Sequence, residues 1–104
     1  MVIYNVTTHV ESSIEKNWLK WMREKHLPEM LATKKFKTAR IFKIISGNDK
    51  GGVSYATQYH CDNKMSLEQY LNHFAAKLRQ DAVNKFGDRI LSFRTELELI
   101  EQQS

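Results

Sequence analysis

Apolar residues change their spacing along this chain, between the two-residue period of a strand and the three-to-four-residue period of a helix. Runs that alternate and are rich in β-branched and aromatic residues predict strands. Four such runs occur, over residues 2–10, 36–45, 53–60 and 90–100. Between the middle two, the turn-forming segment SGNDKGG predicts an antiparallel hairpin.

Two stripes at helical spacing separate these strands. The first carries Trp18 and Met22 on its apolar side. We expect this helix to end near His26, because Pro28 disfavours a helical residue before it, with a further short helical turn beginning at Pro28. The second stripe spans 66–86 and is followed directly by a glycine, a common helix stop.

The resulting order of elements, β-α-β-β-α-β, restricts the fold. Right-handed crossovers place the strands in the order 4-1-3-2, with both helices on one face of the sheet. This arrangement is the ferredoxin-like α+β sandwich. A length of 104 residues suits a single domain of this kind over residues 1–104.

The other face of the sheet is predicted to be open in the monomer. In the last strand Leu91, Phe93, Leu97 and Leu99 suit the helix-covered face, and in the third strand Ala56 does. The open face then mixes polar residues with apolar ones, and an apolar patch of this kind marks an interface. We therefore expect a homodimer whose interface is formed by Ile3, Phe42, Ile44, Tyr55 and Tyr59.

Four segments, IYNVT, WLKWMREKHLPEM, YATQY and FGDRILSFRTELE, resemble those of a bacterial family catalogued as domain of unknown function 4286. The resemblance covers nearly the whole chain in the same order. It implies the dimeric α+β barrel superfamily, whose members pair their sheets and often bind small molecules between sheet and helices. Some of those relatives are monooxygenases or isomerases. Because the family brings no assigned reaction, the resemblance implies a fold more firmly than a function.

His26 is the candidate catalytic residue. A histidine can act as a general base near neutral pH, and helical spacing places this one at the end of the stripe formed by Trp18 and Met22. These three residues form a candidate ligand site at the mouth of an apolar cleft. The alternative, which we favour for one histidine without a visible partner, is that His26 bonds the free carbonyls of the helix end.

A second candidate set for ligand binding lies on the first and last strands, which are predicted neighbours. It consists of His9, Asn5 and Arg94, accompanied by Glu96. These polar side chains can bind a small ligand inside a barrel. The favoured alternative is that they pair with one another across the dimer.

Other protein classes receive little support, and no cofactor is expected. His60 and Cys61 are adjacent, so their side chains leave opposite faces of a strand and do not form a metal site. The segment KGGVSYAT lacks the aromatic residues of an RNA-recognition motif at the required positions, which disfavours nucleic-acid binding. A single cysteine, no secretion signal and no apolar run of membrane length predict a soluble, cytoplasmic protein.

The sequence thus predicts a dimeric domain that binds or transforms a small molecule in a cleft between helices and sheet. The alternative is a non-enzymatic interaction or structural dimer without a ligand, with RNA binding a distant third. An enclosed and partly polar cavity near His26 and Trp18 favours the first function, and a filled interior favours the second.

Overall fold

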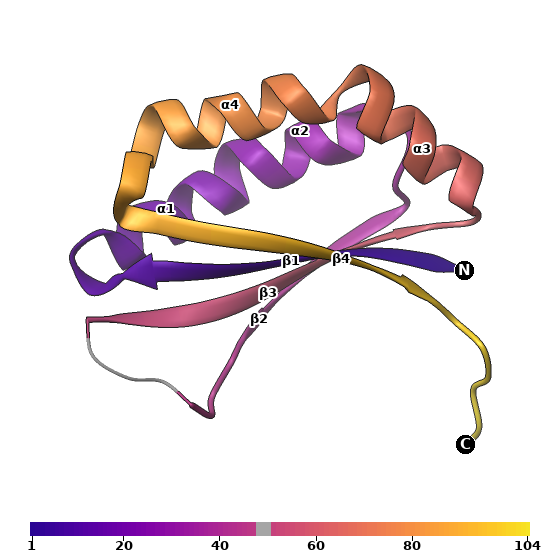
Figure 1. Cartoon of the computed structure of the whole chain (residues 1–104), viewed down its shortest axis with the longest axis horizontal. Coiled ribbons are helices and arrows are strands. Elements are labelled where there is room, and N and C mark those ends of the chain that lie inside the picture. The colour runs from indigo at the N-terminus through magenta and orange to yellow at the C-terminus, as the bar shows by residue number, and fades with distance from the viewer. Residues whose placement is uncertain (48–50) are drawn as a thin grey trace.

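The computed structural model describes residues 1–47 and 51–104. The strands form one antiparallel sheet in the order β2-β3-β1-β4, which confirms the predicted topology (Figure 1). Their bounds are β1 Val2–Glu11, β2 Thr38–Lys43, β3 Gly52–Cys61 and β4 Ile90–Glu98. The tip of the predicted hairpin falls on residues 48–50, which lie outside the described residues.

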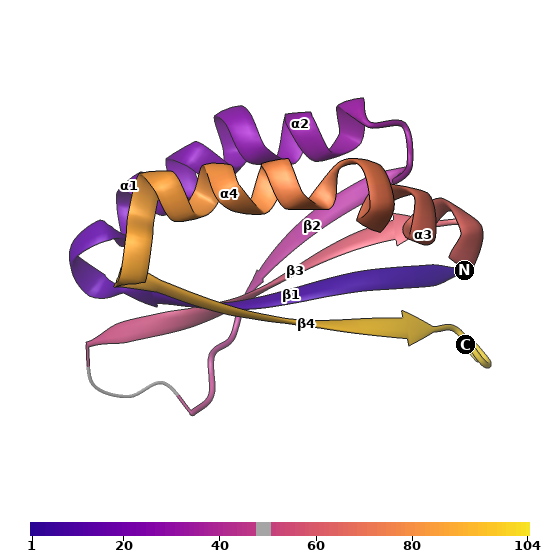
Figure 2. The ribbon, with the colours of Figure 1, turned by 45° about the horizontal axis from the view of Figure 1, so that its top comes forward.

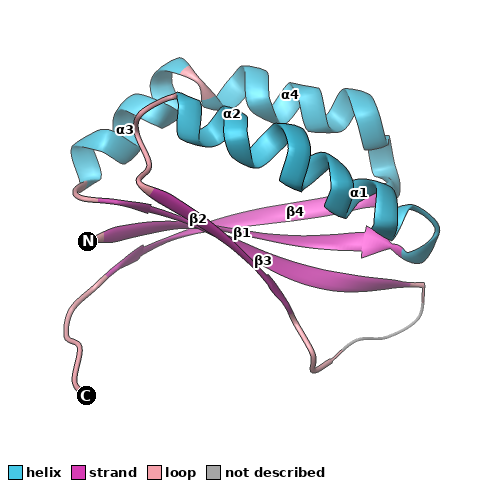
Figure 3. Ribbon diagram, turned by 180° about the vertical axis from the view of Figure 1, so that it is seen from behind, coloured by secondary structure: helices cyan, strands magenta, loops and turns pink. Residues whose placement is uncertain are grey.

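The helices lie together on one face of this sheet, as Figures 1 and 2 show from two directions. They are α1 (Glu15–Trp21), α2 (Leu27–Ala32), α3 (Lys64–His73) and α4 (Ala75–Phe86). Seen from behind in Figure 3, the described chain places no helix on the opposite face. The ferredoxin-like α+β sandwich predicted from the order of elements is confirmed.

The first two helices, α1 and α2, are continuous and are joined by a π-helical turn, η2 (Met22–His26). The N–H of Leu27 donates to the carbonyl of Met22, five residues earlier, and Leu27 keeps a helical φ of −61°. The expected helix end near His26 is therefore wrong, and Pro28 lies in the first turn of α2. In a regular α-helix the proline ring would clash with the carbonyl four residues earlier, and the wider π turn relieves that clash.

The second predicted helix is divided into α3 and α4 at Phe74, whose φ of −126° leaves the helical region. It also begins earlier than residue 66. Asn63 is the N-cap, and its side chain accepts a hydrogen bond of 3.0 Å from the N–H of Ser66. Gly87 ends α4 as predicted, with a φ of +58° that glycine tolerates because it has no Cβ.

Two apolar clusters fill the space between helices and sheet. One contains Tyr4, Tyr59 and Tyr70, and the other contains Trp18 and Trp21. Only 2% of Trp18 and 7% of Trp21 are exposed, so the stripe of the first helix packs on the sheet. These clusters supply most of the apolar burial that stabilises the fold.

The face assignment of β3 is wrong. Tyr55, Thr57 and Tyr59 face the helices with exposed fractions of 4%, 1% and 1%, so the two tyrosines are core residues and do not belong to the open face. Tyr59 pairs directly with the buried Tyr4 of β1. An aromatic side chain buries far more surface than alanine, and this difference decides against placing Ala56 under the helices.

The face assignment of β4 is also wrong. Leu91, Phe93 and Leu97 are 70%, 61% and 43% exposed and lie on the face without helices. Ser92 and Arg94 pair with inward-facing residues of β1 and therefore point toward the helices. Alternation separates the two faces of a strand, but it does not say which face the helices cover.

We call the corrected apolar set the open apolar face. It consists of Ile3, Phe42, Leu91, Phe93 and Leu97. Ile3 and Phe42 keep the position predicted for them. Ile44 lies just beyond β2, where its N–H donates to the carbonyl of Ser54 at 2.9 Å.

Candidate small-molecule site

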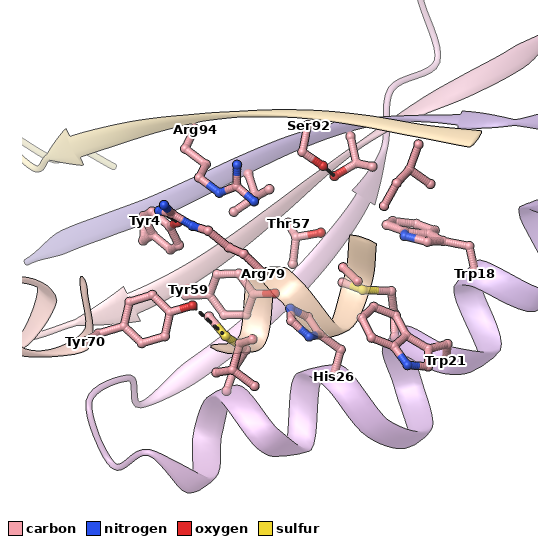
Figure 4. Close-up of a pocket in the computed structure, with 17 residues that line it drawn as sticks. Tyr4, Trp18, Trp21, His26, Thr57, Tyr59, Tyr70, Arg79, Ser92 and Arg94 are labelled. Atoms are coloured by element: carbon pink, nitrogen blue, oxygen red, sulfur yellow. Dashed lines mark hydrogen bonds between the residues drawn. The ribbon is translucent and has the colours of Figure 1, made fainter. Parts of the chain in front are cut away.

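A cavity of about 50 Å³ lies between the sheet and the helices. Most of its wall is apolar, including Trp18, Trp21, Met22, Met30, Leu78 and Ile90. The polar part of the wall includes His26, Thr57, Tyr59, Arg79, Ser92 and Arg94. Figure 4 shows these groups converging from separate elements, with His26 on η2, Arg79 on α4 and Arg94 on β4.

His26 enters the cavity from the π turn. Its ring stacks on Trp21, with the ring centroids 4.8 Å apart and the planes inclined by 19°. Burial lowers the pKa of His26 to about 4, so the imidazole is neutral near pH 7. A neutral imidazole has one nitrogen that donates and one that accepts, so it can both donate a hydrogen bond to a bound molecule and accept one from it.

Three polar atoms of this wall are buried and have no hydrogen-bond partner within the described protein. They are Nδ1 of His26, Oγ1 of Thr57 and Nε of Arg79. Such atoms are uncommon in folded proteins because each costs free energy that a bond would recover. Their convergence on one cavity indicates that this space accepts a polar partner.

Two arginines give the cavity a positive charge. Arg79 donates from Nη2 to the hydroxyl of Tyr4 at 2.8 Å, which fixes its guanidinium. Among the described residues, no aspartate or glutamate lines the cavity, and neither Arg79 nor Arg94 forms an ion pair. Arg94 is exposed, whereas Arg79 is partly buried.

Tyrosines line the cavity from both layers, Tyr59 from β3 and Tyr70 from α3. Burial raises the pKa of Tyr59 and of Tyr70, so both phenols remain protonated across the physiological range. The Tyr70 hydroxyl donates to the sulfur of Met30 at 3.2 Å. These rings form a rigid wall beside the polar groups.

The structure brings together four of the predicted site residues. His26, Trp18, Met22 and Arg94 all line the cavity. Arg94 does so because the faces of β4 are reversed relative to the prediction.

The remaining two predicted ligand residues, Asn5 and His9, lie on the open face of the sheet and do not reach this cavity. The Asn5 side chain donates to Thr7 at 3.2 Å, and His9 Nδ1 bonds the Ser54 hydroxyl at 3.2 Å. They are therefore separated from Arg94 by the sheet itself.

Sequence reasoning missed Thr57 and Arg79. Arg79 occupies a stripe position of α4, four residues after Ala75 and three before Ala82, where an apolar residue is normal. A charged residue at such a position is a signal for a buried polar function. Thr57 lies two residues from each of the buried Tyr55 and Tyr59. It was missed because the face of β3 that carries these three residues was predicted to point away from the helices.

Other types of site have little support in the described part of the chain. Across residues 1–47 and 51–104, no three His, Cys, Asp or Glu side chains gather in a way that could hold a metal ion. In the same ranges, none of the helices has the length and apolarity needed to cross a bilayer.

The fold and the cavity define a ferredoxin-like α+β domain with a small polar site between its sheet and its helices. Within that class, the chain belongs to the family described as domain of unknown function (DUF4286), whose model matches residues 1–100. This confirms the family resemblance seen in the sequence. Comparison with curated proteins finds no match.

Solved structures share the fold at low sequence identity. A dimeric ferredoxin-like protein from an uncultured marine organism is 5% identical with a TM-score of 0.78, over 98% of this chain and 97% of that one. A Deinococcus radiodurans protein provisionally named an antibiotic biosynthesis monooxygenase is 17% identical with a TM-score of 0.66, over 100% and 97%. An ethyl tert-butyl ether D (EthD) family protein from Bacillus halodurans is 14% identical with a TM-score of 0.66, over 96% and 100%. At these identities the likeness establishes the fold alone.

Proposed function

We propose that this protein binds a small molecule in the cavity that His26, Trp18, Met22 and Arg94 line. The observation that carries the proposal is the convergence of three unpartnered buried polar atoms on one cavity whose wall is mostly apolar. A few placed polar groups in an apolar pocket are the usual composition of a small-molecule site. In this proposal, neutral His26 contacts the ligand through a hydrogen bond.

The size of the cavity limits what fits. About 50 Å³ accommodates a few water-sized groups, at roughly 10–15 Å³ each. The occupant is therefore a very small molecule or the polar end of a larger one that enters beside Arg94.

A cavity-filling substitution tests the proposal. Ala82 lines the cavity from α4, and Ala82→Leu would occupy its volume. Ala76→Leu is the matched control, because Ala76 lies on the exposed side of the same helix. Native mass spectrometry of the purified protein should show a bound small molecule in the wild type and in Ala76→Leu, and not in Ala82→Leu. Equal ligand content in all three proteins, or none in any, would count against a site in this cavity.

We further propose that the chain forms a homodimer through the open apolar face. A run of exposed apolar side chains across a sheet favours an interface, and a stable one covers about 800 Å² per partner. The structural neighbour from the uncultured marine organism is described as a dimeric ferredoxin-like protein, which supports the same assembly here.

Charge substitution on this face tests the dimer. Phe93→Asp should shift the sedimenting species from dimer toward monomer, because Phe93 is 61% exposed in the single chain and central to β4. Val83→Asp is the control, since Val83 is 55% exposed but lies on α4, on the helix side. A wild type that sediments as a monomer at tens of micromolar concentration, roughly the range of a weak complex, would refute this assembly.

A further inference from the structure

We propose that the ligand of this cavity is a carboxylate with a short apolar body, held by Arg79, Arg94 and Thr57. The inference rests on the proposed small-molecule function and names the chemical class of the ligand.

The charge of the cavity carries the first step. Two guanidinium groups meet in a largely apolar space, and the described wall supplies no carboxylate to either of them. Arg94 is exposed, but Arg79 is partly buried and its Nε atom is fully buried, so the lack of a counter-ion is costly at Arg79 and a bound anion would reduce that cost. The lining histidine does not add a third positive charge, because burial holds its pKa at about 4.

The geometry of the donors carries the second step. Arg79 Nη2 donates a hydrogen bond of 2.8 Å to the Tyr4 hydroxyl, which fixes the position of the guanidinium. The buried N–H at Nε of Arg79 has no acceptor among the described residues. The planar fork of an arginine matches the two oxygens of a carboxylate. The Thr57 hydroxyl, only 1% exposed and also unpartnered, can donate to the same group.

The remaining wall selects among anions. Met22, Leu78 and Ile90 face the same space, and their side chains have no N–H or O–H group to donate to further oxygens. A phosphate would place additional charged oxygens against these side chains, and a dianion is costlier to desolvate than a monoanion. A carboxylate presents two oxygens to the donors and directs its carbon chain toward the apolar wall.

Matched acids and amides provide the test. Acetate, propionate and butyrate are titrated against acetamide, propionamide and butyramide, with inorganic phosphate as a further probe, and amide chemical shifts of the full chain are followed by NMR. The acids should shift the resonances of η2 and α4. Arg79→Met should weaken their binding by about tenfold or more, as expected for loss of a charged hydrogen bond. Arg89→Met is the control, since Arg89 lies outside the cavity.

The outcomes separate this inference from the function on which it rests. Amides that bind as tightly as the acids, or acid binding unchanged in Arg79→Met, would overturn the carboxylate while leaving a small-molecule site. Stronger binding of phosphate than of any acid would overturn it as well. If no probe binds and no ligand co-purifies, the small-molecule function itself fails.

Discussion

Acidification should destabilise this protein through His26. The ordinary pKa of the imidazole is 6.5, and burial lowers the pKa in the folded protein to about 4. Glu29 and Asp81 act against this lowering, while Lys25 and Arg94 act with it. Between these two pH values the unfolded chain binds a proton that the folded protein does not, so stability falls as the pH falls. The full difference corresponds to about 3 kcal/mol, at about 1.4 kcal/mol for each pH unit.

Urea unfolding followed by tryptophan fluorescence, repeated from pH 7 to pH 4, measures this effect. His26→Gln cannot take up the proton, so its unfolding free energy should fall less steeply over this range than that of the wild type. His73→Gln is the control, because His73 is exposed on α3, and it should retain the wild-type slope. Wild-type and His26→Gln curves that run parallel from pH 6.5 to pH 4 would show that His26 is not buried as a neutral group.

Four further substitutions test the packing and the backbone. Trp18→Ala should cost about 3–5 kcal/mol in urea unfolding, because Trp18 is only 2% exposed, and a loss under about 1 kcal/mol would contradict its place in the core. Thr57→Val should stabilise the ligand-free protein by about 1 kcal/mol, since it removes an unpartnered buried hydroxyl. Thr8→Val should destabilise the protein, because the Thr8 hydroxyl forms a hydrogen bond of 2.9 Å with Ser92. Equal changes in melting temperature for these two variants would refute the difference. Gly87→Ala should cost about 1–3 kcal/mol, since φ is +58° there, and an unchanged melting temperature would refute this strain.

The order and type of the elements were predictable because each depends on local spacing. The orientation of β3 and β4 was not predictable. A two-residue alternation separates the two faces of a strand but does not show which face the helices cover. In β4 the observed orientation is opposite to the expectation that apolar side chains face the helices. Leu91 and Phe93 point outward, while Ser92 and Arg94 point toward the helices. Ser92 and Arg94 line the cavity, and Leu91 and Phe93 form part of the open apolar face.

The candidate site was half predictable for the same reason. Trp18, Met22 and His26 follow one another at intervals of four, so their common direction was visible in the sequence. Arg79 comes from a helix far along the chain, and its approach to His26 depends on how α4 packs beside α2. Such long-range contacts are set by tertiary packing, which one sequence does not reveal.

The π turn also sets the phase of the helix that follows it. In a regular α-helix eight residues overshoot two full turns by about 80°, so Met30 would point well away from Met22. The extra residue in η2 takes up this overshoot, and Met22 and Met30 are both buried, with 4% and 1% of their surface exposed. Deleting one residue within η2 would restore regular winding and leave α2 in the same phase, because seven residues turn by about 700°, within about 20° of two full turns. The backbone irregularity that carries His26 therefore also determines which side chains of α2 reach the core.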